Sequence, residues 1–306
     1  MTFKEKKMSS LIDDIKVKSQ YFLPKKLISR AAGFLASRDL GSLTEGLINT
    51  FIAHYQVDLS EAEITDPKGY KTFNAFFTRA LKKGARPIAA ADTAVVNPAD
   101  GTISEFGEIY KDAVLQAKGH YYSLTSLLGG DEKDAEPFLS GAFYTTYLSP
   151  KDYHRVHMPF DGKLEKMVFV PGTLFSVNPL TAQNVDNLFA KNERVICFFK
   201  NEKLGRFAVV LVGATIVASI ETVFQGVIAP SAGREKTIYH YEKDNITFKK
   251  GAELGRFLLG STTVCVFENK KITFEKALKA GQSVKMGQKM ATLATQAPKT
   301  KKTPAK

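Results

Sequence analysis

The sequence predicts an α+β fold, in which an N-terminal helical region precedes a mostly β core of sandwich or barrel-like form. Three observations carry this prediction. Residues 21–55 have apolar side chains at helical spacing. From about residue 95 the chain consists of short runs rich in β-branched and aromatic residues, separated by Gly, Pro, Asn and Asp. The length of 306 residues, with 44% hydrophobic content, suffices for one large core or for a core with a smaller domain.

Residues 21–90 are the helical region of this organisation. In its first half, Leu23, Leu27, Ala31 and Leu35 fall on one helical face. The same segment carries four basic residues, Lys25, Lys26, Arg30 and Arg38. A basic amphipathic helix can lie among lipid headgroups with its apolar face down, but a helix packed on its own domain has the same pattern. Both interpretations stay open.

A second, shorter helix is expected at residues 71–84, where Gly84 ends it and Pro87 closes the connection. Residues 91–297 form the predicted β core. Within this core, residues 97–109 and 158–170 both read Pro-x-Asp-Gly followed by an alternating strand. Residues 1–20 are an extension before the helical region, and residues 298–306 are a basic tail that we expect to be disordered.

Composition excludes some classes of protein. The two cysteines, Cys197 and Cys265, lie in apolar runs without C-x-x-C or metal-ligand spacing, so the sequence predicts core thiols in a reducing compartment. A net charge of +12 favours a polyanion as partner, either nucleic acid or an anionic membrane surface. No stretch approaches about 20 apolar residues, and the N-terminus lacks a signal-peptide pattern. We therefore expect a cytoplasmic protein that is soluble or lies on a surface.

The run "RFLLGSTTVCVF", residues 256–267, places Gly260 and Ser261 in the middle of what otherwise reads as one buried strand. A glycine in such a run usually marks a bulge or a close approach of two backbones. The simplest interpretation is a kinked strand with a buried hydroxyl.

Two other stretches contain side chains that could carry chemistry. Asp100 lies in "NPADG", before a predicted strand, where most aspartates only bond their own backbone. His154 and His157 lie in "LSPKDYHRVHMPFDG", and their spacing does not assign them to a single site. A metal site has no support, because no third ligand repeats a familiar spacing. Together, however, Asp100, His157 and Ser261 supply the carboxylate, imidazole and hydroxyl needed to activate a nucleophile.

The neighbours of Ser261 suggest what it attacks. "LGST" is not the G-x-S-x-G elbow of the α/β-hydrolases, and a serine within a strand is poorly placed to meet an external ester. It is well placed to attack the preceding carbonyl, that of Gly260, because glycine tolerates the strained backbone this requires. The alternatives are a serine hydrolase that uses Asp100, His157 and Ser261 on an external ester, and a non-enzymatic basic β-sandwich that binds nucleic acid or anionic lipid.

From about residue 20 to residue 297, the chain resembles the bacterial phosphatidylserine decarboxylases that cleave themselves and make their own pyruvoyl cofactor. The resemblance is carried by "YKTFNAFFTRALKKGARPI", "NPADGTIS", "DYHRVHMP", "GTLFSVN" and "LGST", in this order along the chain. It implies a carboxy-lyase that converts phosphatidylserine to phosphatidylethanolamine and CO₂.

The resemblance also implies residue roles. Asp100, His157 and Ser261 would form the triad for self-cleavage between Gly260 and Ser261, giving a large and a small chain. Ser261 would become the pyruvoyl group, which holds the substrate as a Schiff base, so neither a metal nor pyridoxal phosphate is expected. His154 would act in decarboxylation. In the loop of residues 172–178, Ser176 and Val177 are the expected contacts to the substrate headgroup.

The expected partners follow from this interpretation. They are phosphatidylserine, an anionic membrane surface, and the large and small chains made from one precursor, which could pair further as a homodimer of such two-chain units. Nucleic acid is not expected. The expected location is peripheral, on the cytoplasmic face of the cell membrane.

Overall fold

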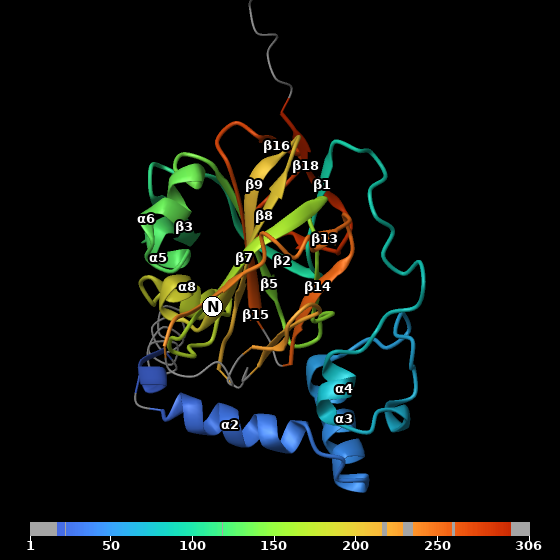
Figure 1. Cartoon of the computed structure of the whole chain (residues 1–306). Helices are drawn as coiled ribbons and strands as arrows, with labels where there is room; N and C mark the ends of the chain where they lie inside the picture. Colours follow the sequence, from blue (N-terminus) through green and yellow to red (C-terminus); the bar gives the residue numbers. More distant parts are fainter. Residues whose placement is uncertain are drawn as a thin grey trace, which may run out of the picture.

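A helical part and a larger part made mostly of strands are evident in the computed structural model, which confirms the predicted α+β class (Figure 1). The structure describes residues 17–294 except residues 22, 118, 216–218, 229–234 and 259–260, and it leaves out the side chains of residues 25, 26 and 30. Residues 1–16 of the predicted extension and the whole predicted tail, 298–306, lie outside the described residues.

Antiparallel strands build the largest sheet, which has nine strands in the described part of the chain. Its order is β12 (Thr237–His240), β7 (Gly162–Val170), β8 (Arg194–Asn201), β9 (Gly205–Val212), β15 (Ser261–Phe267), β5 (Ala142–Leu148), β2 (Gly101–Glu108) and β17 (Ser283–Val284), with β13 (Thr247–Phe248) also paired to β7. Both β2 and β7 begin at the glycine of a Pro-x-Asp-Gly sequence, so the repeated pattern of turn and strand is confirmed.

The large sheet is buried on both faces. Along β15, Val264 and Val266 join one hydrophobic core, whereas Cys265 and Phe267 join the other. This explains why β15 is a continuous apolar run rather than an alternating one. The first core packs under short helices, α5 (Leu124–Leu127), α6 (Glu132–Ala135) and α8 (Leu188–Lys191), which lie on one side of the sheet in Figure 1. Cys197 and Cys265 are buried free thiols in the second core, as predicted.

Two smaller sheets cover the other face. One has the order β1 (Ala94–Val96), β18 (Lys289–Leu293), β16 (Ile272–Phe274). The other has the order β11 (Gly226–Val227), β10 (Ile220–Thr222), β14 (Glu253–Phe257), β6 (Arg155–His157). Since apolar residues of both smaller sheets share the second core with the large sheet, the core is a sandwich of sheets, with helices on the outer face. The strands of residues 113–117 (β3) and 120–123 (β4) form a separate hairpin.

The N-terminal amphipathic segment forms two helices, α2 (Lys25–Ala36) and α3 (Ser42–Tyr55), which are separated at Gly41 in the left-handed region (φ 57°). Its predicted apolar face is solvent-exposed: Leu23 is 45% exposed, Leu27 68% and Leu35 53%. Another face of α2 packs on the rest of the chain, since Ser29 and Ala36 are buried and Ala36 joins the first core. The two interpretations therefore do not exclude each other for α2. Among the described residues, the helices are all too short or too polar to span a bilayer.

Two expectations about local structure are wrong. The helix expected at residues 71–84 ends much earlier, because α4 spans only Phe73–Phe77 and Leu81 instead forms an extended bridge with Ala62. The run at residues 256–267 is not one kinked strand. It is the end of β14 and the start of β15, which belong to different sheets. The interruption at Gly260 therefore coincides with the crossing from one sheet to the other, although Gly260 itself lies outside the described residues.

Candidate active site

Ser261 and Asp100 meet at one edge of the large sheet. β15 begins at Ser261, which lies opposite Leu148, the last residue of β5. β2 begins one residue after Asp100 and pairs with the other side of β5, so that both Thr262 and Thr102 lie opposite Tyr147. Because both pairs are antiparallel, the starts of β2 and β15 and the end of β5 share this edge.

Gly101 allows this close approach. Its φ of +155° is one that other residues rarely adopt, and a Cβ atom at this position would lie 2.2 Å from the backbone oxygen of Tyr147. The glycine of the "NPADG" motif thus lets β2 lie against β5 with Asp100 beside it.

The two histidines arrive at the same edge through the loop that follows β5. The backbone N–H of His157 donates to Pro98 O at 2.8 Å, which fixes His157 beside the turn that carries Asp100. The backbone oxygen of His154 accepts from Phe257 N at 3.0 Å, on the segment that leads to Ser261. The structure therefore gathers all four predicted catalytic residues, although they come from separate elements.

The hydrogen bonds of His157 fix its tautomer. Its Nδ1 lies 2.9 Å from Gly251 O, and its Nε2 lies 3.1 Å from the hydroxyl of Tyr153. A carbonyl oxygen only accepts, so Nδ1 carries the proton and Nε2 accepts from Tyr153. Burial lowers the pKa of His157, which keeps the imidazole neutral. Neither ring nitrogen is hydrogen-bonded to Asp100 or Ser261 among the described residues. The predicted triad residues therefore lie at the same end of the sheet, but the described residues show no hydrogen bonds from His157 to Asp100 or Ser261.

Asp100 has its own partners. Its Oδ1 accepts from Arg86 Nε at 2.9 Å and from the backbone N–H of Met286 at 2.9 Å. Arg86 also pairs with Glu61 at 2.9 Å, and Glu61 accepts from Lys285 Nζ at 3.0 Å. This network joins the helical region, the Asp100 turn and the chain that follows β15. Charge-assisted bonds of this kind fix the position of the Asp100 side chain.

His154 is fully buried, and burial lowers its pKa to about 3. Its Nδ1 lies 2.8 Å from Asp152 O, so Nδ1 carries the proton. Its Nε2 has no hydrogen-bond partner among the described residues, and its ring lies 4.0 Å from that of Phe77. His154 is therefore a neutral imidazole that offers one unused lone pair beside the Phe77 ring.

Ser261 is only 1% exposed, and its Oγ has no hydrogen-bond partner within the described part of the chain. A buried hydroxyl without a partner costs on the order of 1–3 kcal/mol. Thr262 and Thr263 on the same strand also have unpartnered hydroxyls, so what distinguishes Ser261 is its position as the first residue of β15, directly after Gly260 in the sequence.

The two predicted headgroup contacts lie in different surroundings. Val177 and Tyr147 line a pocket of about 240 Å³, together with the start of β2, α7 (Pro179–Ala182) and Gly281. Tyr147 is the strand neighbour of Thr262, but Asp100, His154, His157 and Ser261 do not line this pocket. Ser176 does not line the pocket, and its backbone N–H donates to Gln20 at 2.9 Å. Of the two predicted headgroup contacts, Val177 therefore lines a pocket and Ser176 does not.

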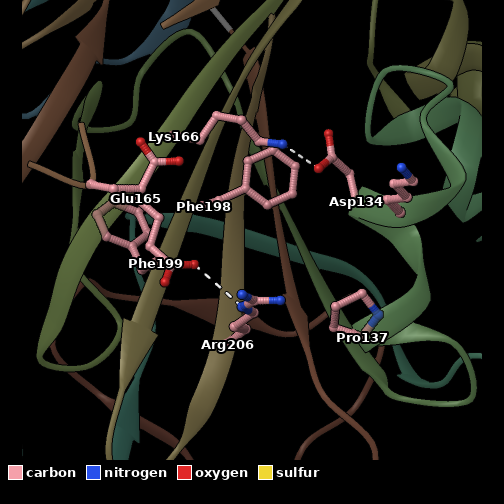
Figure 2. Close-up of a pocket in the computed structure, with 9 residues that line it drawn as sticks. Asp134, Pro137, Glu165, Lys166, Phe198, Phe199 and Arg206 are labelled. Atoms are coloured by element: carbon pink, nitrogen blue, oxygen red, sulfur yellow. Dashed lines mark hydrogen bonds and ion pairs between the residues drawn. The ribbon is translucent and has the colours of Figure 1, made fainter. Parts of the chain in front are cut away.

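Another pocket, shown in Figure 2, contains none of these residues. Its charged side chains are paired with each other: Lys166 with Asp134, and Arg206 with Glu165 at 3.3 Å. The Lys166 ammonium also lies 4.9 Å from the centre of the Phe198 ring. Lys133 and Glu242 also line this pocket, but none of the predicted catalytic residues does, so it is separate from the candidate active site. In the described residues, no group of three or more His, Cys, Asp and Glu could hold a metal ion.

Sequence reasoning did not single out Arg86, Tyr153 or Arg79 as parts of this site. Arg79 and Arg86 lie in "YKTFNAFFTRALKKGARPI" and Tyr153 lies in "DYHRVHMP", so the motifs contained them. The missing signal was burial, because charged residues are almost never buried unless paired and the sequence alone does not show which of them are.

Comparison with known proteins shows the family of this chain. A family model described as phosphatidylserine decarboxylase matches residues 73–292, and a second, described as PSD, matches residues 15–56. The chain is 53% identical over 286 residues to a protein of Shewanella denitrificans named phosphatidylserine decarboxylase proenzyme, covering 92% of this chain and 99% of that protein. A protein of the same name from Vibrio parahaemolyticus is 53% identical over 279 residues, with 90% and 98% covered. The chain belongs to the phosphatidylserine decarboxylase family.

Proposed function

We propose that this chain is a precursor that cuts itself between Gly260 and Ser261 and then decarboxylates phosphatidylserine to phosphatidylethanolamine and CO₂. Family membership supports the reaction, and the name proenzyme that the relatives carry fits a precursor. The observation that carries the proposal is the buried, unpartnered hydroxyl of Ser261 at the sheet edge where Asp100 and His157 also lie.

Self-cleavage uses only the chain's own groups. Ser261 Oγ attacks the carbonyl carbon of Gly260, and the C–N bond breaks to leave an ester and a free amine. Loss of the α-proton of residue 261 then expels the ester oxygen, so that Gly260 ends in a carboxylate and residue 261 becomes a dehydroalanine. This tautomerises to an imine, and water releases ammonia from it, which leaves a pyruvoyl group at the start of the small chain.

His157 is the base that we assign to the attack by Ser261. Its tautomer is suitable, because Nδ1 carries the proton and Nε2 offers a lone pair. The Tyr153 hydroxyl occupies this lone pair in the continuous chain, so Tyr153 has to move aside before Ser261 can donate its proton. Asp100 lies close enough for its charge to favour protonated His157, which stabilises the imidazolium that forms.

The pyruvoyl group supplies a carbonyl that condenses with the substrate amine and accepts the electron pair left as CO₂ departs. His154 is neutral, so it offers no ion pair that would hold the substrate carboxylate in place. Its open Nε2 can take a proton from the substrate ammonium and return it to the carbon that has lost CO₂. The proposed contacts to the substrate headgroup are Val177 and Ser176.

The exposed apolar surface of α2 and α3 is the proposed membrane contact, on the cytoplasmic face of the cell membrane. It includes Leu27 and Phe34 on α2 and Leu43 and Leu47 on α3, all between 47% and 68% exposed. A two-chain lipid does not leave the bilayer at useful concentration, so the active site has to reach the headgroups. The helices also contact the site. Phe51 of α3 lies 6.0 Å from Phe77, whose ring in turn packs on His154.

The test compares the parent chain with Ser261→Ala by intact mass and by release of CO₂ from carboxyl-labelled phosphatidylserine. The parent should give two chains, with the small one blocked at its N-terminus, and Ser261→Ala should give one inactive chain. Thr263→Ala is the matched control, because Thr263 is a buried, unpartnered hydroxyl on the same strand and should be cut normally. A parent that stays intact and is labelled on Ser261 by a fluorophosphonate would instead be a serine hydrolase.

A further inference from the structure

Arg79 is a buried cation whose hydrogen bonds are incomplete. It is 4% exposed, and its Nη2 donates to the backbone oxygens of Lys151 at 2.8 Å and Asp152 at 3.3 Å. Its Nε and Nη1 have no hydrogen-bond partner among the described residues. Asp152 and Asp100 act on Arg79 only through longer-range attraction, and the Asp152 carboxylate is bonded to Ser149 instead. The guanidinium carbon lies 5.7 Å from the centre of the Phe76 ring, but two donors of this permanently charged group have no acceptor among the described residues.

Arg194 shows how this fold treats a buried arginine that has only a structural role. Arg194 is 3% exposed, and all three of its guanidinium nitrogens donate to backbone oxygens at 2.5–2.9 Å. A guanidinium does not escape the cost of burial by losing its proton, so its donors have to be satisfied. By this comparison, Arg79 has the donors of a binding site and not those of a structural clamp.

The unused donors lie beside the proposed reaction centre. Arg79 Nη2 and His154 Nδ1 share one acceptor, the backbone oxygen of Asp152. Arg79 also follows Phe77 by two residues, and the Phe77 ring packs on the His154 ring at 4.0 Å. Whatever binds Arg79 therefore lies next to the imidazole that we place at the reacting carbon.

A guanidinium edge with two free donors recognises an anionic oxygen. Phosphatidylserine offers a carboxylate and a phosphodiester, and the phosphorus is three bonds from the carbon that loses CO₂. An arginine on the carboxylate would stabilise the ground state and oppose decarboxylation, whereas the phosphodiester keeps its charge throughout the reaction. We infer that Arg79 binds the phosphodiester of the substrate headgroup. This inference rests on the proposed function. Because Arg79 is enclosed in the continuous chain, binding requires that cleavage first opens the site.

The experiment uses the processed enzyme in detergent, with dihexanoyl-phosphatidylserine as substrate and dihexanoyl-phosphatidylethanolamine as product inhibitor. The product has the phosphodiester and the amine but no carboxylate, so a change in its inhibition constant cannot arise from a carboxylate contact. In Arg79→Gln, we expect the KM and this inhibition constant to rise together, by roughly tenfold to a hundredfold for the loss of a charged hydrogen-bonding partner. Arg194→Lys is the control, and both constants should stay within about twofold of the parent.

Other outcomes overturn the inference in distinct ways. If KM rises and the inhibition constant for the product stays constant, Arg79 contacts the carboxylate. If neither constant changes and only thermal stability falls, Arg79 is a clamp for the loop at Lys151. If Arg79→Gln does not fold or is not cleaved, Arg79→Lys replaces it, because lysine keeps the charge. The KM and the inhibition constant of the product should then both rise, by a smaller factor than in Arg79→Gln. A parent that neither cuts itself nor releases CO₂ refutes the proposed function, whereas an active parent with an unchanged Arg79→Gln refutes only this inference.

Discussion

The burial of His154 should make the folded chain sensitive to acid. His154 is fully buried with an unpartnered Nε2, and burial lowers its pKa from the ordinary 6.5 to about 3. Between these two values, the unfolded chain binds a proton that the folded chain does not. Stability is therefore complete above pH 6.5 and falls as the pH drops from 6.5 toward 3. For this one group, lowering the pH from 7 to 5 should cost about 2 kcal/mol of unfolding free energy.

The measurement needs a chain that unfolds as one piece, so it is made in Ser261→Ala, with and without His154→Gln. Urea unfolding at pH 7 and at pH 5 gives four free energies. Glutamine cannot titrate, and its amide can still donate to the Asp152 carbonyl. The buried His157, whose pKa is also lowered, is common to both chains, so its contribution cancels in the comparison. The chain with His154 should lose about 2 kcal/mol more than the chain with glutamine. Equal losses, within about 0.5 kcal/mol, would refute the reasoning.

Three further predictions concern processing, membrane contact and stability. His157→Ala should accumulate uncut precursor on a denaturing gel, whereas His154→Ala should be cut at least in part and still release no CO₂. Equal cutting in both would reverse their assigned roles. Leu27→Glu combined with Phe34→Glu should weaken sedimentation with phosphatidylserine vesicles by at least about tenfold and leave activity on a short-chain substrate intact, and unchanged sedimentation would place the membrane contact elsewhere. Arg86→Met should lower the urea-unfolding free energy by about 3–5 kcal/mol, because it strands a buried carboxylate, and a loss under about 1 kcal/mol would show that the pair is effectively solvated.

The residues of the candidate site were predictable where sequence neighbours define their setting. Asp100 comes before a glycine and an alternating strand, and the structure places it at the turn into β2. Ser261 comes before a run of β-branched residues, and it is the first residue of β15. Local patterns suffice here because a turn and the strand after it are set by a few adjacent residues.

Partners from distant parts of the chain could not be predicted. Asp100 is paired with Arg86 across a loop and with Met286, which lies 186 residues further along the chain. The Tyr153 hydroxyl on His157 is close in sequence, but only the turn of the loop brings the two side chains together. The division of residues 256–267 between two sheets was missed for a related reason. A continuous apolar run shows that a segment is buried, not which sheet it joins.

The position of β15 between β9 and β5 determines how firmly the two chains stay associated after the proposed cleavage. The segment that becomes the small chain supplies an inner strand of the large sheet, and its later strands β17 and β18 pair with β2 and β1. Cleavage would therefore create two new chain ends, and the small chain would stay bound to the large chain through the hydrogen bonds of its strands. A small chain made separately would have to insert β15 between β9 and β5 after the large chain had folded. We expect the large and small chains of each molecule to come from the same folded precursor and not to exchange between molecules.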